Sequence, residues 1–180
     1  MTSTQRKATA GTYRRIATMI RPGSRILDYG AGLGHGTFIL GPLAESFEPN
    51  PQEGIWPTYT DASALPRFKY DAVVCNCVLN VVSSHAQRVS IIKHIGELLR
   101  NGGFAYIMVR SHSDVRAIKH ATPEGDGVRT STGSFQRGFS HAELEALVCE
   151  ALPPNAVTVE KIKGISSIGI HLTAADNVII

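Results

Sequence analysis

A glycine-rich segment between a strand and a helix constrains the fold of this chain more than any other part of its sequence. The segment reads ILDYGAGLGHG over residues 26–36, and the apolar residues at its start predict a strand over 24–29. Residues 35–43 can then open a helix, which Gly41 and Pro42 interrupt. Glycines in such a turn let the backbone approach a ligand closely, and the helix N-terminus offers free N–H groups. The segment therefore predicts an α/β fold with a binding loop after its first strand.

The rest of the chain alternates between strand and helix patterns. Apolar, β-branched runs predict strands, and apolar residues at helical spacing with capping residues predict the helices between them. The predicted strands cover residues 24–29, 45–48, 56–60, 71–78, 104–109, 156–162 and 167–173, and the predicted helices cover 12–20, 35–43, 86–100, 113–120 and the stretch from 140 to the prolines at 153–154. A polar, glycine-rich stretch over 123–138 predicts a loop or a hairpin. This order predicts a mostly parallel, doubly wound sheet that ends in an antiparallel strand pair.

Length and composition place these elements in a single domain, residues 1–180. Hydrophobic residues make up 43% and charged residues 18% of the chain, a balance typical of one globular core. The N-terminus has no apolar signal-peptide region, and no run approaches the roughly 20 apolar residues of a membrane helix. These features predict a cytoplasmic protein with no membrane partner. Cys75, Cys77 and Cys149 predict reduced thiols and no metal site, because no second Cys or His pair completes a zinc-like set.

The spacing of the glycines indicates whether the loop binds a dinucleotide or another kind of ligand. A dinucleotide fingerprint, G-x-G-x-x-G, would place its third glycine at the position of His35. The glycines alternate instead at 30, 32 and 34, and Asp28 precedes them by two residues. This D-x-G-x-G-x-G pattern resembles motif I of the class I S-adenosylmethionine (SAM)-dependent methyltransferases. The resemblance implies a Rossmann-like class I methyltransferase fold with SAM as its cofactor. The alternatives are a nicotinamide-dependent oxidoreductase and a glycine-rich turn in another α/β protein.

Further positions are similar to the same family. Glu48 stands at the end of the second strand, where the family's acid accepts hydrogen bonds from the ribose hydroxyls, and Asp61-Ala62 stands near the expected adenine amine. Asn76 ends an apolar strand near the expected methyl group. A solvated Glu48 and a turn or cap role for Asp61 are the alternatives. The cofactor-binding residues implied by the resemblance are Asp28, Gly30, Ala31, Gly32, Gly34, Glu48, Asp61, Ala62 and Asn76.

The connection between Glu48 and Asp61 departs from the family pattern. These two residues are only 13 positions apart, and three prolines stand between them. Proline is excluded from helix interiors, so this connection has no room for a regular helix. We therefore expect the helix that normally links the second and third strands to be lost or reduced to a turn.

Scattered segments also resemble a narrower family, the methyltransferases associated with DNA phosphorothioation. The matching segments are short and read RKATA at 6–10, DYGAG at 28–32, VLNVV at 78–82, VR at 109–110, GDGV at 125–128, GSFQR at 133–137 and FSHAEL at 139–144. This resemblance covers most of the chain but names no methyl acceptor. The N/D-P-P-Y/W/F segment of DNA amino-methyltransferases and the Pro-Cys nucleophile of cytosine-C5 enzymes are both missing from the sequence.

Polar residues after the carboxyl ends of the strands are the candidates for chemistry. Asn76, Asn80 and His112 are the predicted catalytic residues, and His85 and Asp114 are alternative bases. Each of these residues has a simpler alternative role as a turn former or a solvent-facing side chain. The stretch 121–139 is predicted to be a variable loop over the acceptor site, in which Phe135 and Phe139 either stack on a planar base or belong to the core.

The first 27 residues, which include a basic N-terminal arm and helix at 1–23, carry much of the positive charge. Six basic residues precede the first acidic one, although the net charge of the chain is only +3; these are Arg6, Lys7, Arg14, Arg15, Arg21 and Arg25. Either they form a solvated helix face or they contact a phosphate backbone. Nucleic acid is therefore the first acceptor hypothesis, and a small molecule is the second. A SAM-binding regulatory protein without transferase activity is the third, and a protein partner that supplies acceptor recognition fits any of them.

Overall fold

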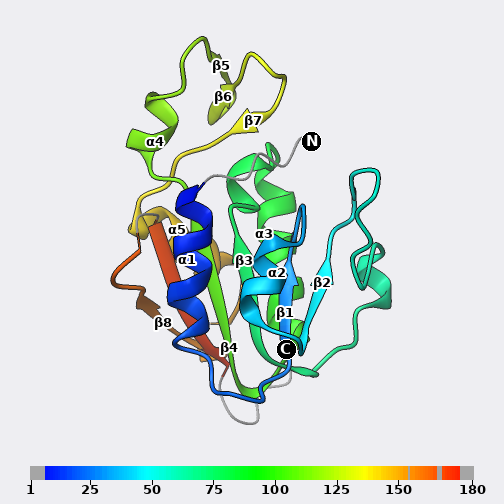
Figure 1. The fold of residues 1–180 in the computed structure, drawn as a ribbon. Coiled ribbons are helices and arrows are strands. Elements are labelled where there is room, and N and C mark those ends of the chain that lie inside the picture. Colours follow the sequence, from blue (N-terminus) through cyan, green and yellow to red (C-terminus); the bar gives the residue numbers. More distant parts are fainter. Residues whose placement is uncertain (1–6, 154, 166–167, 175–180) are drawn as a thin grey trace.

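The computed structural model describes residues 7–153, 155–165 and 168–174 of the chain. Its main sheet consists of β1 (Ile26–Tyr29), β2 (Ala44–Phe47), β3 (Tyr70–Asn76), β4 (Leu99–Val109), β8 (Val157–Lys161) and β9 (Ile168–Ala174). Within this part of the chain the strand order is β2-β1-β3-β4-β9-β8 (Figure 1). The first four strands are parallel, β9 is antiparallel to β4, and β8 is antiparallel to β9. The predicted sheet and its C-terminal antiparallel pair are therefore confirmed.

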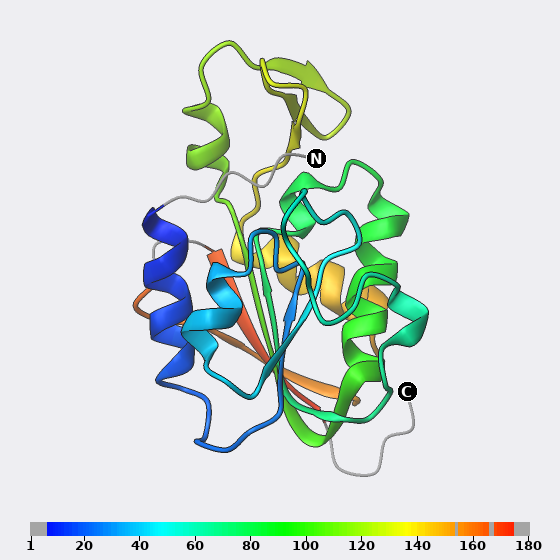
Figure 2. The ribbon, with the colours of Figure 1, turned by 45° about the vertical axis from the view of Figure 1, so that its right-hand side comes forward.

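Helices cover both faces of the main sheet. These helices are α1 (Lys7–Ala17), α2 (His35–Leu40), α3 (His85–Leu98) and α5 (His141–Ala151), while the short helix α4 (His112–Arg116) follows β4 and lies beyond the carboxyl ends of the parallel strands (Figure 1). Alternate residues of the central strand β3 belong to different cores, since successive side chains point to opposite faces. Val74 packs in one core with Ile16 of α1 and Leu40 of α2, while Val73 packs in the other with Ile92 of α3 and Leu144 of α5. This is the doubly wound arrangement (Figure 2).

The connection from β2 to β3 lacks a regular helix, as expected. Its helical part is one 3₁₀ turn, η1 (Ala62–Ala64). The strand predicted at 56–60 is wrong, because only Tyr59 pairs with the edge of β2, in an isolated parallel bridge. Tyr59 donates its N–H to the Ser46 carbonyl at 2.9 Å, and its own carbonyl accepts from the N–H of Glu48 at 3.1 Å. A loop thus covers the edge of β2 that a longer strand would occupy.

The polar stretch after β4 forms a small sheet of its own. It contains β5 (Thr122–Glu124), β6 (Gly127–Arg129) and β7 (Phe135–Gln136), all antiparallel. We refer to residues 122–137 as the cap. The cap lies beyond the carboxyl ends of the parallel strands, next to α4 (Figures 1 and 2). The hairpin alternative for this stretch is therefore the correct one.

Several element boundaries differ from the sequence-based expectation. The first helix covers Lys7–Ala17 instead of 12–20, and the second ends at Leu40 because Gly41 adopts a φ of 111°. The glycines after α3 do not separate it from the next strand, which begins at Leu99 and contains a register shift opposite β3. Among the described helices, none is long and apolar enough to cross a membrane.

Candidate active site

The glycine loop after β1 packs directly against two neighbouring segments. The N–H groups of Gly30 and Ala31 both donate to the Phe47 carbonyl at the end of β2, at 2.8 and 3.0 Å. Gly30 has a φ of 78°, and a Cβ atom placed there would lie 2.3 Å from Cγ2 of Val78, in the segment after β3. Glycine is therefore required at position 30, because both the backbone conformation and the available space exclude a side chain.

Glu48 directly follows β2 and lies next to this loop. Its carboxylate accepts hydrogen bonds from the N–H of Gly32 at 2.9 Å and from the N–H of Asn50 at 3.1 Å. A carboxylate has about four lone-pair positions, so both oxygens can accept a further hydrogen bond from a ligand hydroxyl. The structure thus brings the predicted glycine loop and the predicted acid together at the carboxyl edge of the sheet.

Asp28 lies behind the loop rather than in front of it. Its carboxylate is fully buried, accepting the Tyr13 hydroxyl of α1 at 2.6 Å and the Thr37 hydroxyl of α2 at 2.8 Å. Burial raises the pKa of Asp28 to about 6, against the hydrogen bonds from Tyr13 and Thr37, which lower it. The Asp28 side chain therefore joins α1 and α2 to the end of β1, directly before the glycine loop. Gly34, within the loop, is the N-cap residue of α2.

One of the two predicted adenine-side residues, Ala62, borders a hollow, and the other, Asp61, precedes it as a helix cap. Asp61 caps η1, accepting the N–H of Ser63 at 2.9 Å and its hydroxyl at 2.8 Å, which is the cap role left open by the sequence. Ala62 lines a hollow of about 340 Å³ between η1 and α3, together with Tyr29 and His94. The Tyr29 hydroxyl and Nδ1 of His94 are 3.1 Å apart. The role of Asp61 and Ala62 toward an adenine ring stays a prediction.

Two buried amides mark the carboxyl end of β3. Asn76 is the last residue of the strand, and its Nδ2 is buried with no hydrogen-bond partner in the described part of the chain. Asn80 lies in the short 3₁₀ turn η2 (Leu79–Val81) and is 1% exposed. Its Nδ2 donates to Oε1 of Gln136 in the cap at 3.1 Å, and Oδ1 is buried without a partner in the same part of the chain.

Two side chains that the sequence did not single out, Arg110 and Gln136, complete this cluster. Nη1 of Arg110, just after β4, donates to Oε1 of Gln136 at 3.2 Å. Because arginine is only a donor, this bond fixes which amide atom of Gln136 faces Asn80. That atom is an acceptor, so Asn80 must present its Nδ2 to it. The short segments VR and GSFQR gave the only sequence signal for these two residues.

The three candidate bases are engaged in different contacts. Nε2 of His112 lies 2.6 Å from the Glu143 carboxylate, and Nε2 of His85 lies 2.8 Å from that of Glu150. Burial raises the pKa of Glu143, but hydrogen bonds from His112 and Ser140 outweigh it and lower the pKa to about 2. Asp114 forms a capping box with Ser111 at the start of α4. His112 thus stands beside the cap, and Asp114 has the role of a helix cap.

The sequence left open the roles of two aromatic residues and of the N-terminal basic residues. Phe135 and Phe139 are 6% and 1% exposed, and the Arg137 guanidinium lies over the Phe139 ring at 4.4 Å. Both rings therefore belong to the core and neither can stack on a base. Arg25 precedes β1, at the amino end of the sheet and away from the glycine loop, and its N–H binds Asp71 there. Arg6 lies outside the described residues.

A second hollow lies on the outer side of the glycine loop. It measures about 300 Å³ and is lined by the loop, by α2 and by residues 55–57. Phe38 and Trp56 border it and are 87% and 88% exposed. These apolar side chains stand where the β2–β3 connection provides no helix to cover them. Among the described residues, no group of His, Cys, Asp and Glu is arranged to hold a metal ion.

Comparison of the whole structure with solved structures identifies its fold. The sugar N-methyltransferase KedS8 from Streptoalloteichus sp. ATCC 53650 matches with a TM-score of 0.68 at 18% identity, over 95% of this chain and 88% of that chain. A 1,6-didemethyltoxoflavin-N1-methyltransferase from Burkholderia thailandensis, with S-adenosylhomocysteine bound, matches with a TM-score of 0.66 at 20% identity, over 94% and 80%. SAM-bound CalS10, an amino pentose methyltransferase from Micromonospora echinaspora, gives 0.67 at 15%, over 94% and 92%.

No protein-family model matches the sequence, and no curated protein sequence matches it. At the identities above, the structural matches establish the fold. The chain therefore has the Rossmann-like fold of the SAM-dependent methyltransferases, as the glycine pattern implied.

Proposed function

We propose that this protein is a SAM-dependent methyltransferase that acts on a nitrogen atom of a small molecule. The observation that carries the proposal is the meeting of Glu48 with the N–H of Gly32 on the glycine loop. Glu48 would accept the ribose hydroxyls of SAM, and the loop backbone at Gly30 and Ala31 would lie along its amino-acid part. Asp61 and Ala62 would border the adenine, and Asn76 would lie near the methyl group.

Bound SAM supplies a methyl group on a positively charged sulfur, and transfer is an in-line displacement that depends on alignment. The nitrogen lone pair of the acceptor forms the new C–N bond while the S–C bond breaks and its electrons remain on sulfur. The chain's contribution is to hold the acceptor at the carboxyl edge of β3, beside the cap. Asn76 and Asn80 are the proposed contacts with the reacting groups, since both carry buried amide atoms without partners in the described residues. His112 is the proposed proton acceptor.

Structural matches favour a small acceptor over nucleic acid. The three proteins compared above are named as methyltransferases of a sugar, a toxoflavin precursor and an amino pentose. Phe135 and Phe139, which would have to be exposed to stack on a base, are buried, and Arg25, one of the six basic residues near the N-terminus, lies at the amino end of the sheet. A link to DNA phosphorothioation remains a prediction from the short matching segments, and so does a cytoplasmic location.

Transfer of a tritiated methyl group from SAM tests the proposal. The protein is incubated with labelled SAM and, in separate reactions, with a panel of amino sugars and heterocyclic amines, with duplex DNA and with RNA. Label in a small amine is the expected result. Label in DNA or RNA would establish the first acceptor hypothesis instead. SAM binding without transfer to any acceptor would favour the regulatory alternative.

A further inference from the structure

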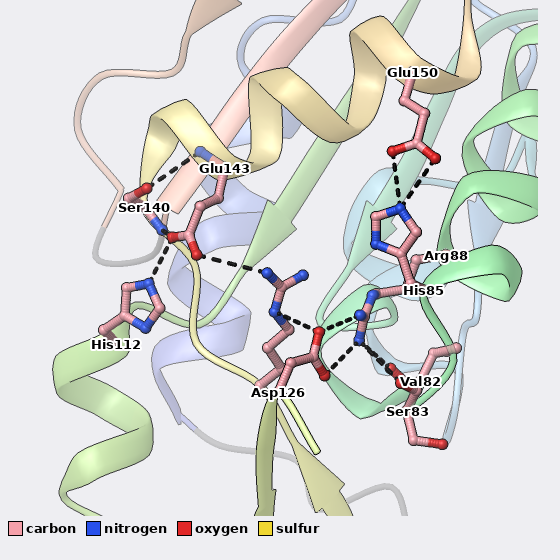
Figure 3. Close-up of polar contacts among 10 residues, drawn as sticks. Val82, Ser83, His85, Arg88, His112, Asp126, Ser140, Glu143 and Glu150 are labelled. Carbon is pink, nitrogen blue, oxygen red and sulfur yellow. Dashed lines mark hydrogen bonds and ion pairs between the residues drawn. The ribbon is translucent and has the colours of Figure 1, made fainter.

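A fully buried cation, Arg88, lies near the carboxyl edge of β3, where methyl transfer is proposed and which we call the transfer edge. The proposed function gives this residue no part in the transfer itself. Arg88 belongs to the first turns of α3, and its side chain is 0% exposed. A buried charge is costly unless it is paired and hydrogen-bonded, so its partners indicate what it does. These partners are two backbone carbonyls of the segment after β3 and one carboxylate of the cap (Figure 3).

The first set of contacts fixes the segment that carries Asn80. Nη1 of Arg88 donates to the Val82 carbonyl at 2.8 Å and, more weakly, to the Ser83 carbonyl at 3.4 Å. Both carbonyls directly follow η2, in which Asn80 is buried. Arg88 thus holds the end of the segment whose beginning contacts the glycine loop through Val78.

The second contact reaches the cap. Nη2 of Arg88 donates to the Asp126 carboxylate, which stands in the turn between β5 and β6. Asp126 also pairs with Nε of Arg137 at 3.1 Å. Nη2 of Arg137 lies 3.6 Å from Glu143 of α5, which in turn accepts the N–H of Ser140 at 2.7 Å. A continuous set of charges therefore runs from α3 through the cap to α5.

Apart from these charged contacts, the outer part of the cap makes little packing contact with the rest of the protein. None of residues 121–134 is buried, so this part of the cap buries almost no apolar surface. Its inner end is joined to the same segment after β3 by two further bonds: the N–H of Arg137 donates to the Asn80 carbonyl at 2.8 Å, and Gln136 accepts from Asn80. The exposed hairpin is reached at Asp126, by Arg88 from α3 and by Arg137 from the inner end of the cap.

We propose that Arg88 is a positioning residue that sets the cap over the transfer edge through Asp126, so that acceptor recognition depends on it and SAM binding does not. The inference rests on the proposed function, because it assumes that transfer takes place at the carboxyl edge of β3, beside the cap. Arg88 touches neither partner of the reaction in this account. It acts through the segment 78–83 and through the cap.

Hydrogen–deuterium exchange of the full chain tests the inference without an acceptor. Asp126→Ala is the main variant, since Asp126 is 42% exposed and stands in the hairpin turn, outside the apolar cores of the sheet. Arg88→Met is the second variant. The matched control is Glu124→Gln, which removes a carboxylate of the same hairpin whose partner, Arg129, lies within the cap.

In Asp126→Ala we expect exchange in residues 122–137 to become about tenfold faster while exchange in β1 and β3 stays the same. The SAM dissociation constant, measured by calorimetry, should stay within about twofold of the wild type, and Glu124→Gln should change neither quantity. With an amine that the wild type methylates, the KM for the acceptor should rise about tenfold and that for SAM should not.

Unchanged exchange in the cap of both variants would overturn the inference, and so would faster exchange spread evenly over the sheet, which would mean that Arg88 only stabilises the fold. Loss of SAM affinity in Asp126→Ala would also contradict it. A wild-type protein that does not bind SAM at all would instead refute the proposed function, so the two failures are distinguishable.

Discussion

Substitution of Gly30 by alanine should damage both the fold and the cofactor site. The backbone there has a φ of 78°, and left-handed geometry costs a residue with a Cβ about 1–2 kcal/mol. The new Cβ would also stand 2.3 Å from Cγ2 of Val78, and forcing extra atoms into a packed site costs about 1–3 kcal/mol. We therefore expect the free energy of unfolding to fall by about 2–5 kcal/mol.

Gly23 provides the matched control for this substitution. Its φ is 83°, but nothing lies within 4 Å of a Cβ placed there, and it precedes β1 at the other end of the sheet. Gly23→Ala should cost only the backbone part, about 1–2 kcal/mol, and leave SAM affinity unchanged. Urea unfolding and calorimetric titration with SAM measure both quantities. Equal losses of stability in the two variants, or an unchanged SAM affinity in Gly30→Ala, would refute the reasoning about the loop.

Three further predictions concern strain and titration. Cys77 adopts a φ of 61° at the end of β3, so Cys77→Gly should raise the unfolding free energy by up to about 1 kcal/mol in urea unfolding; a loss would mean that its side-chain contacts outweigh the strain. The pKa of Asp28 is raised from its ordinary value of 3.8 to about 6, so the folded state holds the proton more tightly, and the stability due to this group should decrease as pH rises from about 4 to about 6. The difference in unfolding free energy between wild type and Asp28→Asn, followed against pH, should show this slope, and a flat difference would contradict the burial of the carboxyl. The pKa of Glu143 is lowered to about 2, so its contribution should be present above about pH 4.5 and be lost as pH falls toward 2; Glu143→Gln should remove that dependence, and a variant that keeps it would exclude Glu143 as the source.

The elements that the sequence predicted well are those with a strong local signal. A strand that is buried on both faces, such as β3, leaves a continuous apolar run in the sequence. A helix that is buried on one face, such as α3, leaves apolar residues at helical spacing. Each pattern therefore predicted the right element. The glycine loop predicted the fold, and the family resemblance singled out Glu48 at the end of the second strand. The geometry of the loop follows from the chain itself, since Gly30 allows an approach that no other residue permits.

The parts that the sequence missed depend on contacts between distant segments. Asp28 is 15 residues from Tyr13, whose hydroxyl it accepts, and no local pattern indicates that the two meet. Arg88 looks like an ordinary exposed helix residue, and only the return of the chain in the cap places Asp126 beside it, 38 residues later. The strand expected at 56–60 has the right local composition, but β2 spans only four residues, Ala44–Phe47, and the loop pairs with it at a single position.

The most direct test of the account is a calorimetric titration of the protein with SAM and with NAD, repeated on Glu48→Gln. This substitution keeps the size of the side chain but replaces one carboxylate oxygen by a donor, so the ribose hydroxyls lose an acceptor next to Gly32. The account predicts that the wild type binds SAM in preference to NAD and that Glu48→Gln weakens SAM binding about tenfold or more. Preferential binding of NAD, or equal SAM affinity in the two proteins, would contradict it.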